Sequence, residues 1–120
     1  MANNAFPTEI TLHQQSKTLE LVYGDDRFQL TAEYLRVYSP SAEVRGHGAG
    51  QEVLQINKEQ VGINQLEPSG NYALKIYFDD GHDSGLFTWD YLYDLATQQD
   101  VHWQDYLNRL AKAGIQRQLD

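Results

Sequence analysis

The chain has 120 residues, no cysteine and a formal net charge of −8 at pH 7. We expect residues 1–120 to form a single domain, because this length supports only one modest hydrophobic core. The absence of cysteine excludes disulfides, thiolate zinc sites and cysteine nucleophiles. The excess of Asp and Glu over Lys and Arg disfavours nucleic-acid binding, which needs basic side chains to neutralise phosphates. Either solubility or a basic protein partner explains the charge.

The first part of the chain predicts an antiparallel meander. Residues 9–13 and 18–23 alternate apolar and polar side chains with a period of two, and "QQSK" between them suits a hairpin turn. A turn at Gly24 then leads into a third short strand over 27–30.

A short helix and a loop follow the meander. Thr31 is a suitable N-cap for a helix over 32–38, which must end before Pro40. Residues 39–50, "SPSAEVRGHGAG", predict a loop, because they are rich in Ser, Pro and Gly and show no sustained period. Residues 52–57, "EVLQIN", predict another short strand.

The second half of the sheet structure comes from residues 61–68 and 71–80, a strand pair joined by the turn "PSGN". The glycine- and aspartate-rich stretch 79–85, "DDGHDSG", turns the chain again into a short strand over 86–88.

Two amphipathic helices complete the chain. Apolar side chains recur at helical spacing from Trp89, with Thr88 as N-cap, and again from Trp103, after a cap near Asp100 and before Gly114. The predicted class is therefore α+β: an antiparallel β meander and hairpins with a short helix and two C-terminal amphipathic helices packed on the sheet. The chain lacks the roughly 18–20 apolar residues of a membrane span and shows no signal peptide, so we expect a cytoplasmic protein.

The glycine-rich and aspartate-rich loops carry no complete motif. "RGHGAG" (45–50) lacks the pattern of a phosphate-binding loop, and the aspartates of 79–83 lack the ligand spacing of an EF-hand. No Gly-x-Ser-x-Gly sequence surrounds Ser39, Ser41 or Ser84, so the residues alone indicate no hydrolase.

A metal site remains an open alternative. His47 and His82 both lie in loops beside glycines, and a site built from them and Asp80 would have acceptable ligand chemistry if the two loops met. No pair of histidines stands at the spacing that binds a metal on one helix.

Three stretches resemble the gamma-butyrobetaine hydroxylase-like N-terminal domain family. They are "ITLHQQSKTLELVYGD" (10–25), "LRVYSPSAEVRGHG" (35–48) and "LEPSGNYALKIYFDDGHDSGLFTWDYLYDL" (66–95). The resemblance covers about residues 9–96 and leaves 97–120 as a C-terminal helical extension. In that family the domain precedes the catalytic domain of 2-oxoglutarate-dependent hydroxylases, is fused to iron–sulfur carrier ATPases, or stands alone in bacteria.

The resemblance also implies that a structural zinc site of the hydroxylases is lost in this chain. The hydroxylases hold zinc through three cysteines and one histidine, and their positions fall here on Ser39, Ser41, Val44 and His82. Serine and valine are not zinc ligands at neutral pH, so we expect no cofactor and a lost zinc site, with His82 anchoring its loop.

The resemblance implies a non-catalytic accessory domain, because the oxygenase domain is absent from this chain. We therefore expect an interaction module with an unidentified protein partner, linked to iron–sulfur or redox-cofactor handling. The acidic surface and the loops 39–50 and 79–85 are its candidate contacts. The alternative is a metal-binding protein that uses the His47, His82 and Asp80 site, and a small stand-alone enzyme ranks below both.

Overall fold

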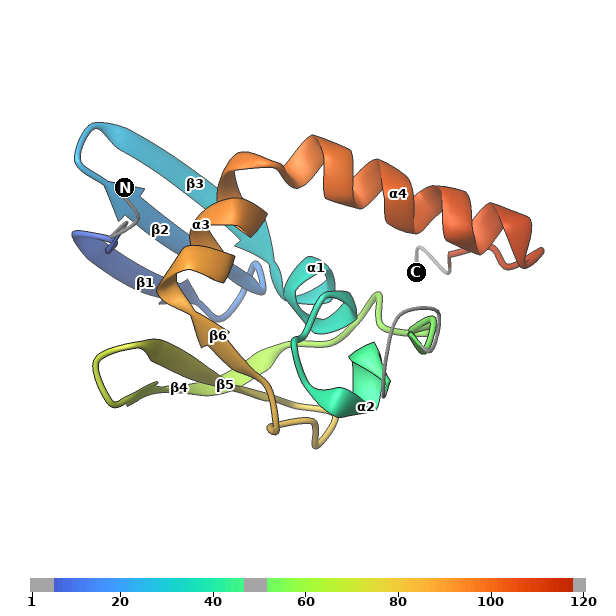
Figure 1. Ribbon diagram of the computed structural model, residues 1–120, viewed down its shortest axis with the longest axis horizontal. Helices are drawn as coiled ribbons and strands as arrows, with labels where there is room; N and C mark the ends of the chain where they lie inside the picture. Colours follow the sequence, from blue (N-terminus) through green and yellow to red (C-terminus); the bar gives the residue numbers. More distant parts are fainter. Residues whose placement is uncertain (1–5, 47–51, 118–120) are drawn as a thin grey trace.

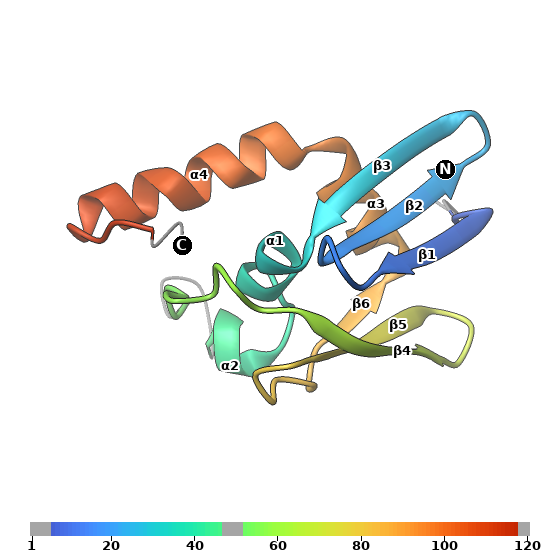
Figure 2. The same cartoon turned by 180° about the vertical axis from the view of Figure 1, so that it is seen from behind.

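Two three-stranded antiparallel sheets and four helices make up the computed structural model, which describes residues 6–46 and 52–117 (Figures 1 and 2). The first sheet holds β1 (Glu9–His13), β2 (Thr18–Tyr23) and β3 (Asp26–Thr31) in chain order, and the second holds β4 (Ile63–Ser69), β5 (Ala73–Phe78) and β6 (Leu86–Thr88). The helices are α1 (Ala32–Val37), α2 (Ala42–Arg45), α3 (Trp89–Thr97) and α4 (Gln99–Lys112). The predicted α+β class is confirmed.

One hydrophobic core joins both sheets to α1 and α3, because the apolar face of each sheet must be covered. Residues that are inaccessible to solvent come from every one of these elements: Leu19, Leu21, Leu30, Leu35, Ile76, Phe87, Leu92 and Leu95. The meander therefore contributes to the same core as the later hairpins, and its period-two pattern is what places leucines there.

Helix α1 lies between the second sheet and α4 (Figure 1) and is buried along its whole length. Thr31 caps it as predicted, since the hydroxyl accepts a hydrogen bond from the Tyr34 amide at 3.0 Å. Helix α4 packs on α1 through a second, smaller cluster formed by Val37, Tyr106 and Leu110. The C-terminal helix thus covers a side of α1 that the sheets do not.

Three local predictions were wrong. Residues 52–57 form no strand, and Gln55 turns inward while Val53 and Ile56 are exposed, so the alternation does not describe this segment. The predicted loop 39–50 contains the short helix α2, which Ser41 caps. The N-cap of α4 is Gln98 rather than a residue near Asp100, and its side chain forms no capping hydrogen bond.

No helix in residues 6–46 and 52–117 is long and apolar enough to cross a membrane.

Candidate functional site

Two loops that are far apart in the sequence meet at Ser39 and His82. Ser39 follows α1, and His82 lies in the turn between β5 and β6. Ser39 has no exposed surface and His82 is 5% exposed, and the Ser39 Oγ lies 2.8 Å from the His82 Nε2. The structure therefore brings together two of the four positions that the family resemblance implies as zinc-ligand positions.

Glu43 completes a chain of hydrogen bonds through the histidine. Its Oε1 lies 2.8 Å from the His82 Nδ1, and its side chain is largely exposed. Because an ionised carboxylate only accepts, Nδ1 must carry the proton, and the neutral ring then accepts from the Ser39 hydroxyl at Nε2. The backbone of His82 is held as well, since the Phe78 amide donates to the His82 carbonyl at 3.0 Å.

This order of hydroxyl, imidazole and carboxylate matches that of a nucleophilic triad, but the hydroxyl is enclosed. A Cβ placed on Gly85 would lie 2.3 Å from the Ser39 Oγ, so the chain itself packs tightly against that oxygen. Nucleophilic attack needs a carbonyl carbon within about 3–3.5 Å of the oxygen, and the tight packing around the Ser39 Oγ opposes such an approach. The three residues instead connect the loop before α2 to the β5–β6 turn through hydrogen bonds.

The other two zinc positions lie in and beside α2. Ser41 accepts a hydrogen bond from the Glu43 amide at 3.1 Å as the cap of α2, and its Oγ lies 2.6 Å from that of Ser84. Val44 is 7% exposed and contributes only methyl groups. Two hydroxyls, one imidazole and one valine do not fit zinc, which takes thiolate, imidazole or carboxylate ligands.

Asp80, the carboxylate of the alternative metal site, is already bound by three donors. Its Oδ2 lies 2.9 Å from the Arg36 Nε and 3.1 Å from the Lys58 Nζ, while its Oδ1 accepts from the His82 amide at 3.1 Å. Burial raises the pKa of Asp80, but these donors outweigh that effect and lower it to about 2. His47 lies outside the described residues, so its distance from His82 stays untested.

The environment of His82 disfavours the imidazolium. Burial lowers its pKa below the usual 6.5, the Arg36 guanidinium adds to this effect, and Glu43 opposes it only in part. The site therefore contains a neutral histidine at pH 7, held between a hydroxyl and a carboxylate.

We predict that the free energy of unfolding falls when the pH drops below about 6.5. Below about pH 6.5, His82 is protonated in the unfolded chain but still neutral in the folded chain. The unfolded state therefore binds more protons, and lowering the pH stabilises it relative to the folded state. Urea unfolding at about pH 7.5 and about pH 5.5 measures the loss, and His82→Asn should reduce it whereas His102→Gln should not. An NMR titration in which His82 protonates above 6.5 would contradict this assignment.

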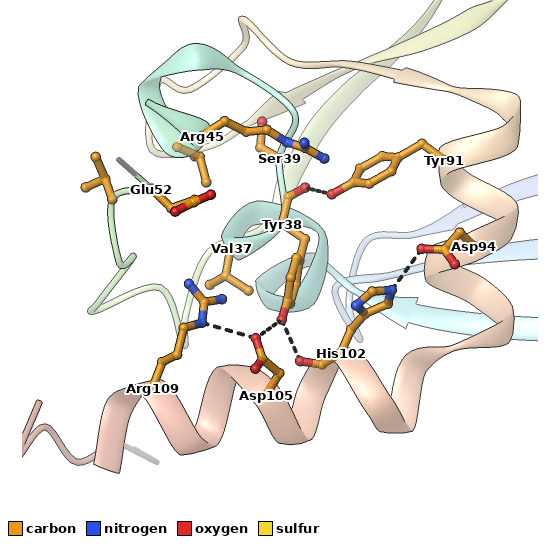
Figure 3. A pocket seen from close by; sticks show the side chains of 12 residues that line it. Val37, Tyr38, Ser39, Arg45, Glu52, Tyr91, Asp94, His102, Asp105 and Arg109 are labelled. Carbon is orange, nitrogen blue, oxygen red and sulfur yellow. Dashed lines mark hydrogen bonds and ion pairs between the residues drawn. The ribbon is translucent and has the colours of Figure 1, made fainter. Parts of the chain in front are cut away.

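A cavity of about 560 Å³ opens beside this site, between the Ser39 loop, α2, α3 and α4 (Figure 3). Arg45 and Tyr91 line it on one side, and Asp105 and Arg109 of α4 line it on the other. The sequence does not predict this cavity, because its walls come from five segments whose approach no local pattern encodes: residues 37–39, α2, residues 52–53, α3 and α4.

The fold and the site define a small α+β domain whose α1–α2 loop is tied to the β5–β6 turn. The chain matches the family described as "Gamma-butyrobetaine hydroxylase-like, N-terminal" over residues 10–93, and it belongs to that family. No curated protein matches it.

Solved structures agree with this assignment. Two proteins known from NMR solution structures are 60% and 47% identical to the chain, with TM-scores of 0.84 and 0.78; the matches cover 97% and 98% of this chain and 92% and 89% of those chains. A crystal structure from Acidithiobacillus ferrooxidans, of a protein of unknown function in the DUF971 family, is 36% identical with a TM-score of 0.59. That match covers 75% of this chain and 91% of the other.

Proposed function

We propose that this chain is a non-catalytic accessory domain that binds a protein partner in the cytoplasm. The proposal includes the absence of a bound zinc and a link to iron–sulfur or redox-cofactor handling, which the family resemblance implies. The observation that carries it is the closed Ser39–His82–Glu43 chain: its hydroxyl has no exposed surface, so the side chains at the family's metal positions support a fold rather than a reaction.

The partner would bind three aromatic side chains that we call the aromatic patch: the exposed Phe6 and Tyr72 and the half-buried Trp89. Phe6 is 55% and Tyr72 56% exposed, and the rings of Phe6 and Trp89 lie 6.0 Å apart. The Trp89 amide donates to the Tyr72 carbonyl at 3.2 Å, which keeps the two residues adjacent. Exposed aromatic residues are enriched at protein interfaces.

The negative charge of this chain indicates which kind of partner surface would bind it. The chain carries −8, and the exposed Asp90 directly follows Trp89 in the patch. A partner with an apolar centre and surrounding Lys and Arg side chains would complement this surface. In the 39–50 and 79–85 loops, Ser39, Ser41 and His82 are buried. We therefore favour the aromatic patch over these loops as the surface that contacts the partner.

A photo-crosslinking amino acid at position 72 tests the proposal in the native cell, with position 104, an exposed glutamine on α4, as the control. We expect a protein adduct from position 72 and none from position 104. With the purified partner, Tyr72→Ser should weaken binding by at least about tenfold, as loss of an interface aromatic does, and Gln104→Ser should not. No adduct, or the same adduct from both positions, would refute the proposal.

The metal-binding alternative stays a prediction. A metal at His82 would have to replace its bonds to Ser39 and Glu43, and one at Asp80 would compete with Arg36 and Lys58. Elemental analysis of protein purified without a histidine tag tests it: stoichiometric zinc or iron would favour the alternative. Thermal stabilisation by added metal provides a second readout.

A further inference from the structure

The cavity between the Ser39 loop, α2, α3 and α4 has the size and lining of a small-molecule site. Its volume of about 560 Å³ lies within the roughly 300–1,000 Å³ that ligand pockets occupy. Val37, Val44 and Val53 supply apolar wall, and arginine side chains enter from α2 and α4 (Figure 3). Apolar walls with a few charged groups are typical of sites for small organic molecules.

The acidic side chains around the cavity already have partners. The Asp94 Oδ2 lies 2.8 Å from the His102 Nε2, and Asp105 pairs with Arg109 at 3.3 Å and lies 3.4 Å from the Tyr38 hydroxyl. Glu52 is engaged as well. These carboxylates are therefore already engaged within the walls of the cavity.

In the part of the chain that the structure describes, both arginines have N–H groups that no described hydrogen bond uses. The Arg45 guanidinium lies 5.2 Å from the centre of the Tyr91 ring, and within residues 6–46 and 52–117 it forms no ion pair. The Arg109 guanidinium lies 5.7 Å from the centre of the Tyr38 ring, and its Nε–H is not aligned for a hydrogen bond with Asp105. Each guanidinium has five N–H donors, and stacking on a ring leaves the edge that binds carboxylates open.

We propose that this cavity binds a small organic acid. Arg45 and Arg109 hold its carboxylate, and its carbon skeleton packs against Val37, Val44 and Val53. The carboxylate fits because guanidinium groups bind it through paired, charge-assisted hydrogen bonds. Larger polyanions are disfavoured by the overall charge of −8 and by the three carboxylates in the walls.

The cavity depends on helix α4, which lies beyond the part of the chain that matches the family model. The family match ends at residue 93, whereas Arg109, Asp105 and His102 all belong to α4. A family domain without this helix would lack one wall of the cavity. Ser39 and Val44, two of the family's metal positions, also line this cavity, whereas none of the aromatic-patch residues does.

Ligand titrations of the full chain followed by proton–nitrogen NMR test the proposal, with phenylacetate as the probe. We expect saturable shifts at residues around the cavity, including the Arg45 and Arg109 Nε–H signals. The neutral analogue phenylacetamide should bind at least about tenfold more weakly, because it loses the charge-assisted hydrogen bonds. Sulfate controls for non-specific anion binding.

Two variants and a matched control locate the binding. Arg45→Gln and Arg109→Gln should each weaken phenylacetate binding by about tenfold or more, whereas Arg27→Gln, at an exposed arginine outside the cavity, should not. The same spectra report whether each variant is folded. Absence of saturable shifts, equal binding of phenylacetamide, sulfate binding without phenylacetate binding, or unchanged affinity in both cavity variants would overturn the proposal.

Discussion

Replacing Asp80 with asparagine lowers the free energy of unfolding by about 2–4 kcal/mol, because it leaves the buried Arg36 guanidinium without its carboxylate. The Arg36 side chain is only 9% exposed, and its other described bond runs to the neutral Gln55 Oε1 at 3.0 Å. Asparagine retains the oxygen that accepts from the His82 amide, so the turn keeps its hydrogen bond. The loss therefore reports the charge rather than the shape of the residue. Urea unfolding measures it.

Asp83→Asn is the matched control for this experiment. Asp83 lies in the same turn but is exposed, so its replacement should change the free energy of unfolding by less than about 0.5 kcal/mol. Equal effects of the two substitutions would show that the ion pairs of Asp80 contribute nothing specific.

Lowering the pH should also remove the stabilisation that the ion pairs of Asp80 provide. The pKa of Asp80 is lowered from 3.8 to about 2, so the folded state gains stability wherever the carboxylate is ionised above 3.8. This gain disappears as the pH falls towards about 2, and the shift corresponds to about 2 kcal/mol. Asp80→Asn should remove this part of the acid sensitivity while Asp83→Asn retains it.

The sequence predicts most of the regular structure because local chemistry determines it. The strands of the first sheet follow from side-chain alternation, and the helix starts follow from Thr31 and Thr88, whose hydroxyls accept from amides three residues later. Gly114, with φ of +74°, ends α4 as expected for a residue in the left-handed region.

The errors occur where tertiary contacts outweigh local preference. Residues 52–57 have a strand-like pattern, but the Gln55 side chain accepts from Arg36 and its carbonyl accepts from the Tyr106 hydroxyl at 2.6 Å. These bonds turn a polar residue inward and leave the segment outside both sheets. The Ser-Ala-Glu sequence at 41–43 is the signal that could have identified α2, since Ser41 caps it.

The candidate site was only partly predictable for the same reason. The family resemblance identified Ser39, Ser41, Val44 and His82 as one set, but the partner on the other side of the histidine, Glu43, came only from the structure. The Arg36–Asp80 ion pair joins residues 44 positions apart, and no periodicity encodes such a contact. Pairing across that distance depends on how the sheets and helices pack.

Introducing cysteines at three of the family's metal positions should convert the closed loop into a zinc site. In a chain with Ser39→Cys, Ser41→Cys and Val44→Cys, three thiolates and the His82 Nε2 supply the four ligands of a tetrahedral site. Ser39 already lies 2.8 Å from His82, and Ser41 and Val44 stand at the start and on the first turn of α2. Without metal this variant should be less stable than the parent, because it loses the Ser39–His82 hydrogen bond.

Zinc should then raise the melting temperature of the variant by on the order of 15 °C, because free zinc at about 1,000 times the Kd adds about 4 kcal/mol. The parent chain should not respond, since its hydroxyls and valine do not replace thiolates.

A variant that carries Val53→Cys in place of Val44→Cys keeps three thiols but moves one to an exposed position, and it should bind zinc far more weakly. Cobalt absorption spectra report the tetrahedral geometry directly. A parent chain that zinc stabilises as strongly as the triple variant would show that the chain binds zinc without the cysteines, and the proposal of a metal-free accessory domain would then be wrong.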